Sequence, residues 1–185
     1  MMIMNNRMVK FEKVSYEQFK KDYIDTFGDF LSRRFDEDEN EIEQHIEDVY
    51  NSIKLPKRAT SGSAGYDFFC PIGITVDVNA TVKIPTGIRC KMDNGWVLQI
   101  YPRSGHGFKT GSHLANTVGI IDEDYYGSEN EGHVFVKLVN DSVLAKSIQL
   151  KAGDAFCQGI FVPYGITADD DVTDVRNGGF GSTSK

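Results

Sequence analysis

A mainly β fold with an N-terminal α-helical hairpin is the fold class that the sequence predicts. From about Ile53 onward, short runs rich in Val, Ile, Tyr and Phe are separated by Gly, Asn, Asp and Pro. Strands divided by turn residues in this way are typical of a β sandwich or barrel. Residues 16–51 instead repeat apolar side chains every three or four positions, which is the spacing of amphipathic helices. Residues 8–14 before them read as a strand, so we expect the helices to interrupt the β fold.

Each of the two predicted helices has a start signal of the capping-box type. Ser15 is followed three positions later by Gln18, and Asn40 by Glu43. Residues 36–39 supply the turn between the helices. Because amphipathic helices usually face their own core, we expect the apolar faces to pack on the β body, with a docking face for a protein partner as the alternative. The apolar residues of the two faces are Tyr16, Phe19, Tyr23, Phe27, Phe30, Leu31, Ile42, Ile46, Val49, Tyr50 and Ile53.

The predicted strands of the β region follow in chain order. They lie in the segments GITVDV, TVKIPTGIRCKM, GWVLQIY, GHVFVKLVN, SIQLKAG and AFCQGIFVPY. Residues 114–121 have some helical character but are interrupted by Gly119, so we expect strand or loop there. His106 is expected to lie in a loop.

The charge of the chain is concentrated at its N-terminal end. Of the net charge of −7, residues 1–53 contribute −6, with 7 Lys or Arg against 13 Asp or Glu. The remaining residues are nearly neutral, so neither part offers the basic surface that binding to nucleic acids or anionic membranes needs. A few local cations and backbone amides could still hold a small anionic ligand.

Length and cysteine pattern fit a single cytoplasmic domain. A chain of 185 residues can bury a core without disulfides. Cys70, Cys90 and Cys157 are odd in number and lie in apolar segments, which predicts buried, reduced thiols. The histidines show no zinc-ligand spacing with them. No membrane span or secretory signal is recognisable, so we expect a cytoplasmic protein.

Two segments combine glycine, small hydroxyls and one charge in a way that suits phosphate or metal binding. In residues 61–67 (SGSAGYD), glycines precede Asp67, whose carboxylate could hold metal-bound water; an ordinary turn into a strand is the alternative. In the segment YPRSG, Arg103 supplies a cation, Ser104 a hydroxyl and Gly105 a closely approachable backbone. A β-turn with Arg103 in a structural salt bridge explains this second segment equally well.

A third and a fourth segment place single polar residues beside or within apolar runs. Asp122 emerges from an apolar run and Tyr125 follows three residues later, which suggests a carboxylate at a pocket wall beside an aromatic platform. A general base there would need free lone pairs, whereas the alternative is a hairpin turn lined by acids. Residues 153–154 (Gly-Asp) are expected to form a hairpin turn. Gln158, polar within an apolar strand, needs a partner, and a ligand phosphate or metal-bound water could supply it.

The C-terminal residues 176–185 (RNGGFGSTSK) form the fifth segment. Their composition alone is typical of a disordered tail. Phe180 lies among glycines, with Arg176, Ser182 and Thr183 around it. That combination also suits a flap whose ring stacks on a base while hydroxyls, amides and the guanidinium surround phosphates.

Taken in this order, the five segments closely resemble the five motifs of the trimeric dUTPase family. The resemblance covers about residues 53–185. It implies one domain, 1–185, with a jelly-roll or β-clip barrel, in which 16–51 are a helical insertion or extension and 174–185 a flexible arm. It also implies that the chain is an enzyme that hydrolyses dUTP to dUMP and pyrophosphate with Mg²⁺, as a homotrimer with shared active sites.

The resemblance assigns roles to individual residues. Asp122 is implied to be the catalytic base that activates water for attack on the α-phosphorus, and Asp67 to reach Mg²⁺ through water. Tyr125 is implied to lie under the deoxyribose and to exclude a ribose 2′-hydroxyl. The residues implied to bind substrate are Arg103, Ser104, Gly105, Asn116, Gly119, Ile120, Ile121, Tyr125, Gln158, Arg176, Phe180, Gly181, Ser182 and Thr183.

These substrate-binding residues fall into three groups. Asn116 and the backbone of residues 119–121 are implied to read uracil. Residues 103–105 are implied to bind phosphates, and Gln158 to contact the phosphates and the waters on Mg²⁺. Residues 176–183 belong to the arm that is implied to close over the substrate of a neighbouring subunit.

Two other functions are compatible with parts of this pattern. The related dCTP deaminase class shares the fold and trimer but attacks the base, and it is expected to lack the GGFGST arm. A nucleotide-sensing regulatory protein on the same scaffold could use the acidic helices to dock a protein partner. Because no motif residue is missing, we expect an active enzyme. Residues 16–51 have no counterpart in the minimal family pattern, and residues 127–133 are longer than its usual tight hairpin.

Overall fold

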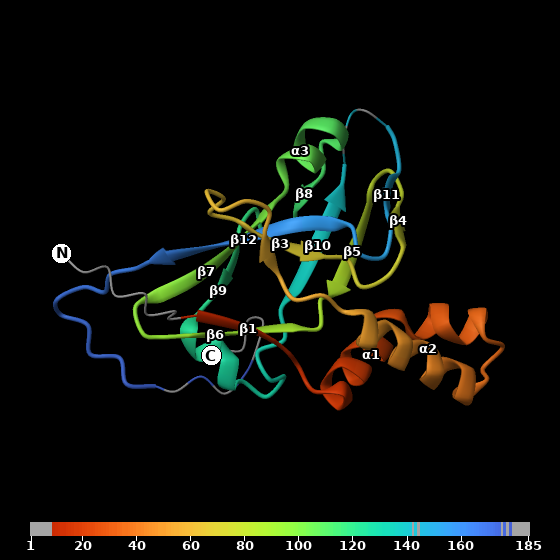
Figure 1. Ribbon diagram of the computed structural model, residues 1–185, viewed down its shortest axis with the longest axis horizontal. Helices are drawn as coiled ribbons and strands as arrows, with labels where there is room; N and C mark the ends of the chain where they lie inside the picture. The colour runs from red at the N-terminus through yellow and green to blue at the C-terminus, as the bar shows by residue number, and fades with distance from the viewer. Residues whose placement is uncertain (1–8, 142, 144, 175, 177, 179–185) are drawn as a thin grey trace.

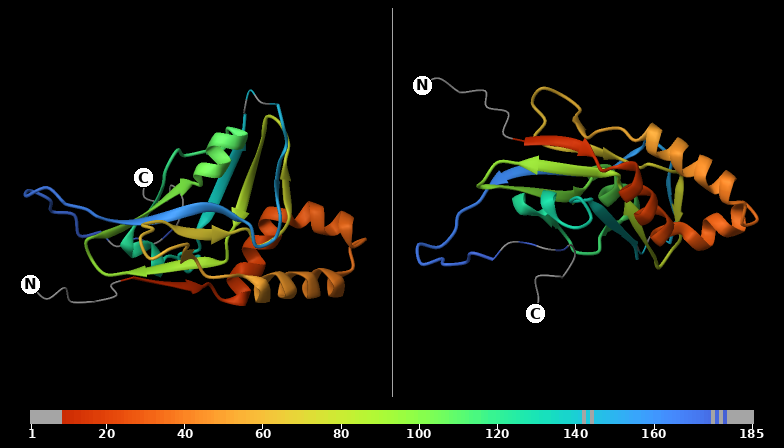
Figure 2. Two further views of the ribbon diagram at one scale, coloured as in Figure 1. Left: turned by 45° about the horizontal axis from the view of Figure 1, so that its top comes forward. Right: turned by 90° about the horizontal axis from the view of Figure 1, so that it is seen from below.

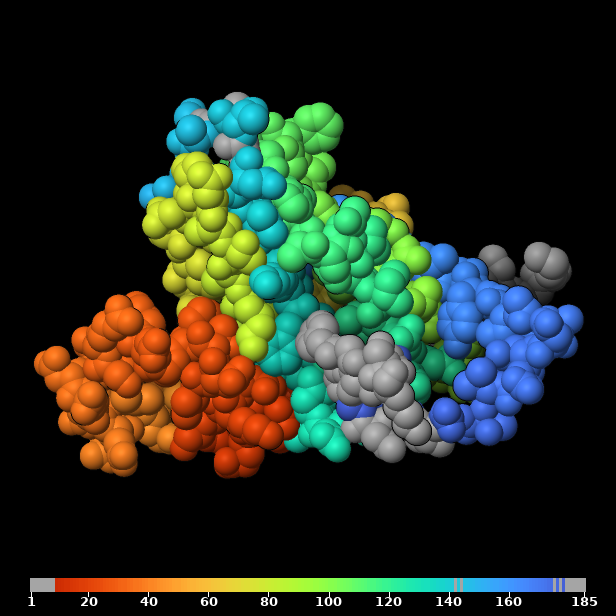
Figure 3. Space-filling view, turned by 180° about the vertical axis from the view of Figure 1, so that it is seen from behind, coloured from red at the N-terminus to blue at the C-terminus, as the bar shows by residue number. Residues whose placement is uncertain are grey.

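The protein is mainly β, with an α-helical hairpin at its N-terminal end, as predicted. The computed structural model describes residues 9–141, 143, 145–174, 176 and 178. The two hairpin helices lie side by side at one end of the β body (Figures 1 and 2). The segment that follows the last strand extends from the opposite end, in blue in Figure 3.

The described residues form twelve strands, three α-helices and a short 3₁₀ helix. The helices are α1 (Tyr16–Arg34), α2 (Glu39–Ser52), α3 (Ser104–Thr110) and the 3₁₀ helix η1 (Glu123–Gly127). The strands are β1 (Val9–Lys13), β2 (Lys57–Arg58), β3 (Tyr66–Phe69), β4 (Ile74–Val76), β5 (Ala80–Pro85), β6 (Ile88–Met92), β7 (Trp96–Pro102), β8 (His113–Leu114), β9 (Gly119–Ile121), β10 (Phe135–Asn140), β11 (Ile148–Leu150) and β12 (Ala155–Pro163). None of the described helices is both long enough and apolar enough to cross a bilayer.

Antiparallel pairing organises these strands into four groups. Within the described residues, the strand orders are β1-β6, β5-β10-β8, β11-β4 and β2-β3-β12-β7-β9. None of the four groups closes on itself there, so the described strands form a jelly-roll-like body without a closed barrel. In the largest group, β12 lies between β3 and β7, and β9 lies on the other edge of β7.

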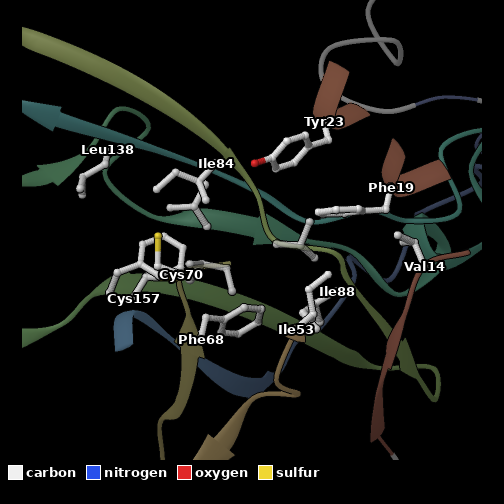
Figure 4. Close-up of a cluster of buried hydrophobic side chains, with 14 of the residues drawn as sticks. Val14, Phe19, Tyr23, Ile53, Phe68, Cys70, Ile84, Ile88, Leu138 and Cys157 are labelled. Atoms are coloured by element: carbon white, nitrogen blue, oxygen red, sulfur yellow. The ribbon is translucent and has the colours of Figure 1, made fainter. Parts of the chain in front are cut away.

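The hydrophobic core lies between the strands and beneath helix α1. Figure 4 shows Phe19 and Tyr23 of α1 close to Ile84 and Ile88 of the β body, and all four are buried. The strands contribute alternate residues, as β10 does with the buried pair at 136 and 138 on either side of an exposed lysine. The apolar face of α1 therefore packs on the β body, as expected, and completes its core.

The three cysteines are free and buried, which confirms the sequence prediction. Burial raises the pKa of Cys70 and of Cys90 to about 12. The pKa of Cys157 is raised as well, again chiefly by burial. Their thiols therefore stay protonated near neutral pH and behave as small apolar side chains.

Helix α1 begins after Ser15, as predicted, but its capping box is only half formed. Ser15 Oγ accepts a hydrogen bond from the Gln18 amide N–H at 3.1 Å. The Gln18 side chain does not return the bond: it donates to Asp22 at 2.8 Å, and the Ser15 N–H donates to Glu131 at 2.8 Å. The first turn of α1 is therefore tied to residues 127–133, far along the chain.

The predicted start of α2 at Asn40 is wrong, because Asp38 is the N-cap. One oxygen of the Asp38 carboxylate accepts from the amides of Asn40 at 2.9 Å and Glu41 at 3.1 Å. Asp36 and Glu37 before it adopt φ values of +47° and +63°, which turn the chain tightly between the helices. Because the geometry of this turn decides where the helix begins, residue spacing alone misplaced the cap.

Helix α3 corrects the expectation that His106 lies in a loop. His106 lies inside the helix, and its carbonyl accepts a hydrogen bond from the Thr110 hydroxyl at 2.6 Å. Gly111, in the left-handed conformation with φ +69°, ends the helix by donating to the Gly107 carbonyl at 3.0 Å. Two glycines within the helix lower its helix propensity, which explains why the local pattern did not predict it.

Replacing Phe19 with Ala tests whether α1 completes the core. Phe19 is fully buried against Tyr23, Tyr50 and His133, whereas Phe30 of the same helix is 49% exposed. We expect Phe19→Ala to lower the free energy of unfolding by about 3–5 kcal/mol. Phe30→Ala is the matched control and should cost less than about 1 kcal/mol. Urea denaturation measures both, and equal losses would contradict this role of α1.

Candidate active site

Three polar side chains predicted to contact phosphate and metal-bound water meet on the largest sheet. The register places Asp67 of β3 directly opposite Gln158 of β12. Arg103, at the end of β7, approaches Asp67 with its Nε 3.0 Å from the carboxylate, and its Nη1 donates to the Ala155 carbonyl at 3.3 Å. The Gln158 amide donates to the Pro102 carbonyl at 3.2 Å. We call Asp67, Arg103 and Gln158 the phosphate cluster.

The sequence left two interpretations open for Arg103, phosphate binding and a structural salt bridge, and the structure is compatible with both. The Arg103 guanidinium makes the structural salt bridge to Asp67, yet 41% of the side chain stays exposed and can meet an anion. Ser104 and Gly105, the first residues of α3, are exposed next to it. A side chain at Gly105 would meet nothing within 4 Å, so the backbone there is open to a ligand.

Glycines make room for the side chains of the phosphate cluster. A Cβ atom at Gly65 would lie 2.5 Å from Oε1 of Gln158, so the absence of a side chain lets the Gln158 amide occupy that space. Gly159, the residue after Gln158 in β12, also leaves no room for a side chain. Its Cβ would lie 2.8 Å from a methyl group of Leu98 and 2.9 Å from the ring of Phe68.

A pocket of about 440 Å³ lies beside β9 and contains the residues predicted to read uracil. Thr117, with φ +64°, turns the chain between β8 and β9. Gly119 lies so close to β7 that a Cβ would come within 3.1 Å of Ile100. The pocket is lined by Lys83, Ile100, Leu114, Ala115, Asn116, Gly119, Ile120, Ile121, Phe135, Val136 and Lys137. We call it the base pocket, and its lining from β5 and β10 was not predicted from the sequence.

Asp122 directly follows β9 and is approached by the C-terminal segment of its own chain. Its side chain is 48% exposed, and Nη2 of Arg176 forms an ion pair with its Oδ2. Nε of Arg176 contacts Asp124 at 2.8 Å, and the guanidinium lies 5.8 Å from the ring centre of Tyr125. Arg176 thus lies beside the predicted base, while residues 180–183 of the predicted arm lie outside the described residues.

Tyr125 is buried and firmly held. Its hydroxyl donates to the His133 carbonyl at 2.9 Å and accepts from the Asn130 amide at 2.7 Å. Burial is the main reason that the pKa of Tyr125 is raised, so the hydroxyl stays neutral. No local pattern predicted these two partners, since residues 127–133 read only as an unusually long hairpin.

Within one chain, Asp122 and the phosphate cluster lie apart. Ile121, just before Asp122, pairs with Leu98 of β7, and Arg103 follows Leu98 by five residues. At about 3.3 Å per residue, this offset is roughly 16 Å along the strand. Arg103 also turns to β3, which β12 and β7 separate from β9. A single chain therefore does not bring both side chains to the same phosphate group.

A mainly β body with a largely apolar pocket and a separate, partly exposed Arg–Asp–Gln cluster has the features of a nucleotide-binding protein. The dUTPase family model matches residues 51–184, and the chain belongs to the dUTPase family. Strand β1, helix α1 and most of α2 precede the matched residues.

Individual relatives agree with this assignment. The chain is 39% identical over 135 residues to the deoxyuridine 5′-triphosphate nucleotidohydrolase of Lactococcus lactis, covering 71% of this chain and 88% of the relative. It is 40% identical over 145 residues to that of Haemophilus ducreyi, covering 74% and 91%. A crystal structure of the dUTPase from Streptococcus mutans has a TM-score of 0.57 at 37% identity, covering 63% of this chain and 90% of that one.

Gly159→Ala tests the packing that holds Gln158 in place. Because an added methyl group would press on both Leu98 and Phe68, we expect the free energy of unfolding to fall by about 1–3 kcal/mol. Gly165 follows β12 in open space and provides the control, since Gly165→Ala should leave stability within about 0.5 kcal/mol of wild type. Thermal unfolding, monitored by circular dichroism, measures the stability of both variants. A Gly159→Ala variant as stable as wild type would contradict the tight packing.

Proposed function

We propose that this protein hydrolyses dUTP to dUMP and pyrophosphate, with Asp122 as the general base. The observation that carries the proposal is the continuity of β9 and Asp122. The strand lines the base pocket with Gly119, Ile120 and Ile121, and the next residue is a half-exposed carboxylate. Relatives 39% and 40% identical to this chain are deoxyuridine 5′-triphosphate nucleotidohydrolases, which supports the same substrate here.

The base pocket would hold the uracil ring. Its apolar walls suit one face of a base, and Asn116 with the backbone of residues 119–121 offers the polar groups that can distinguish one base from another. Tyr125, fixed through its hydroxyl, would lie under the deoxyribose and leave no space for a 2′-hydroxyl. The base and sugar are thus bound by one continuous stretch of chain that ends in the proposed base.

The phosphate cluster would bind the triphosphate. Arg103 supplies a cation that is already oriented by Asp67, and Ser104 and Gly105 add a hydroxyl and an open backbone beside it. The Gln158 side-chain amide donates one N–H to the Pro102 carbonyl. Its second N–H or its oxygen would contact a phosphate oxygen or a metal-bound water. Charge neutralisation of this kind supplies much of the rate in phosphoryl transfer.

The residues of the phosphate cluster fit Mg²⁺ bound mainly through substrate and water. Among the described residues, no group of three His, Cys, Asp or Glu side chains could hold a metal by itself. Asp67 is the carboxylate of the cluster, and Mg²⁺ commonly combines one or two carboxylates with substrate phosphates and waters. When bound, Mg²⁺ would offset the negative charge of the triphosphate and of the leaving pyrophosphate.

In the proposed reaction, Asp122 accepts a proton from a water molecule as the water oxygen bonds to the α-phosphorus. The bond from that phosphorus to the oxygen bridging the α- and β-phosphates breaks, and pyrophosphate leaves. The carboxylate can accept the proton through Oδ1, because in the free chain the Arg176 guanidinium is paired with Oδ2 of Asp122. The phosphates of the incoming substrate offer the guanidinium an alternative anionic partner.

We further propose that the chain acts as a homotrimer with shared active sites. The offset between Asp122 and the phosphate cluster supports this, because the two halves of the site lie too far apart within one chain to act on the same substrate. A neighbouring copy would bring its phosphate cluster to the base pocket of the first. Residues 180–183 would then close over the substrate of a neighbour. We also propose that the chain is one domain, acting in the cytoplasm, with 174–185 as its arm.

Asp122→Asn tests the base. We expect kcat for pyrophosphate release from dUTP to fall by about 10²- to 10⁴-fold, because the amide cannot accept the water proton. Asp124→Asn is a matched control, since Asp124 also pairs with Arg176 but has no proposed part in proton transfer. Pyrophosphate and ammonia release from dUTP, dCTP, dTTP and UTP separate hydrolysis from deamination. Equal losses in both variants, or ammonia release from dCTP, would contradict the proposal.

Mixing two inactive variants tests the shared site. Asp122→Asn retains an intact phosphate cluster, and Arg103→Ala retains an intact base. After unfolding and refolding together in equal amounts, random trimers should regain about a quarter of the wild-type sites, because those sites combine the two intact halves. Each variant refolded alone is the control. A mixture no more active than its components would contradict sharing between copies.

A further inference from the structure

His133 connects helix α1 to the β body through a buried hydrogen-bond pair. Its ring is fully buried, with Nδ1 2.6 Å from the Asp22 carboxylate and Nε2 2.7 Å from the Gly87 amide nitrogen. A backbone N–H can only donate, so Nε2 must be the acceptor. The ring proton therefore lies on Nδ1, and His133 donates it to Asp22.

Asp22 is a suitable acceptor at the other end of this bond. Burial opposes its ionisation, but hydrogen bonds from His133 and from the Gln18 amide, at 2.8 Å, outweigh that effect and lower the pKa of Asp22. The carboxylate therefore remains charged at neutral pH. A charged acceptor in a buried setting makes the contact to His133 strong and directional.

The same residue, His133, holds Tyr125. The His133 carbonyl accepts the Tyr125 hydroxyl at 2.9 Å, while Asn130 donates to the hydroxyl oxygen at 2.7 Å. The ring and the carbonyl belong to one residue, so the contacts of the buried ring help to hold the carbonyl that accepts from the Tyr125 hydroxyl. His133 thus links Asp22 on α1, through its ring, to Tyr125, through its carbonyl. Tyr125 is the residue proposed to lie under the sugar.

Residues 127–133 are held to α1 at a second point. Both oxygens of Glu131 accept from Ser15, one from its N–H at 2.8 Å and one from its hydroxyl at 2.6 Å. Gly132 turns tightly against the backbone of Tyr125, where a Cβ would lie 2.7 Å from the Tyr125 carbonyl oxygen. Ser15, the N-cap of α1, and Asp22 therefore both form hydrogen bonds with residues 127–133, the segment that contacts Tyr125.

We propose that Asp22 and His133 are positioning residues for Tyr125, so that helix α1 sets the discrimination between deoxyribose and ribose nucleotides. This inference rests on the proposed hydrolysis of dUTP. Without the Asp22 carboxylate, the His133 ring loses its acceptor, its carbonyl shifts, and Tyr125 gains freedom to move away from a 2′-hydroxyl. The added helices then have a role at the substrate pocket of their own chain.

The experiment compares kcat and KM for dUTP and UTP in full-length variants, well below their melting temperatures. Asp22→Ala should lower the ratio of kcat/KM for dUTP to that for UTP by about tenfold, because small displacements of a positioning group have large kinetic effects. Asp22→Asn keeps an oxygen acceptor and should restore much of the ratio. Asp29→Ala is the matched control, because Asp29 is an exposed carboxylate of the same helix and takes no part in this network.

The outcomes separate this inference from the proposed function. A wild-type enzyme that prefers dUTP, together with an Asp22→Ala variant of unchanged ratio, would overturn the positioning role alone and leave α1 as packing. Failure of the wild type to hydrolyse dUTP would overturn both. If Asp22→Ala does not fold, Glu131→Gln loosens the second attachment and should shift the ratio in the same direction. An unchanged ratio in that variant would also overturn the inference.

Discussion

The pairing of β12 with β3 on one edge and β7 on the other is the constraint on which the rest of the structure depends. Gly159 permits it, because no side chain fits between Leu98 and Phe68 at that point. The register of these pairings places Asp67 opposite Gln158. A slip of one residue would turn every side chain of the strand to the other face. The phosphate cluster therefore exists only in this register.

The same sheet keeps the base pocket away from the phosphate cluster. Strand β9 pairs with the edge of β7 opposite to β12, so each half of the proposed nucleotide site belongs to a different edge. Assembly of copies would join the halves. Arg176 adds a cation to the base side, because it forms ion pairs with both Asp122 and Asp124. In the proposed reaction this guanidinium lies next to the carboxylate that activates water.

Helix α1 serves the β body in two ways. Its apolar face closes the core, and its polar contacts reach residues 127–133 through Asp22 and Ser15. The dUTPase family match begins at residue 51, after α1. A helix outside the residues matched by the family model thus contacts the segment that holds the Tyr125 hydroxyl. The extra helices and the long hairpin, two departures from the minimal family pattern, are therefore joined by direct hydrogen bonds.

The sequence by itself determined the elements that depend on neighbours a few positions apart. The positions of most strands along the chain, the helical hairpin, the cap at Ser15 and the buried cysteines follow from local periodicity and turn residues. The resemblance selected the phosphate cluster and, from the lining of the base pocket, Asn116 and residues 119–121 as site residues. Only tertiary structure decided that Arg103 pairs with Asp67, that a glycine-containing segment becomes α3, and that His133 meets Asp22. That last contact spans 111 residues of chain and forms only when α1 packs on the sheet, so no local pattern encodes it.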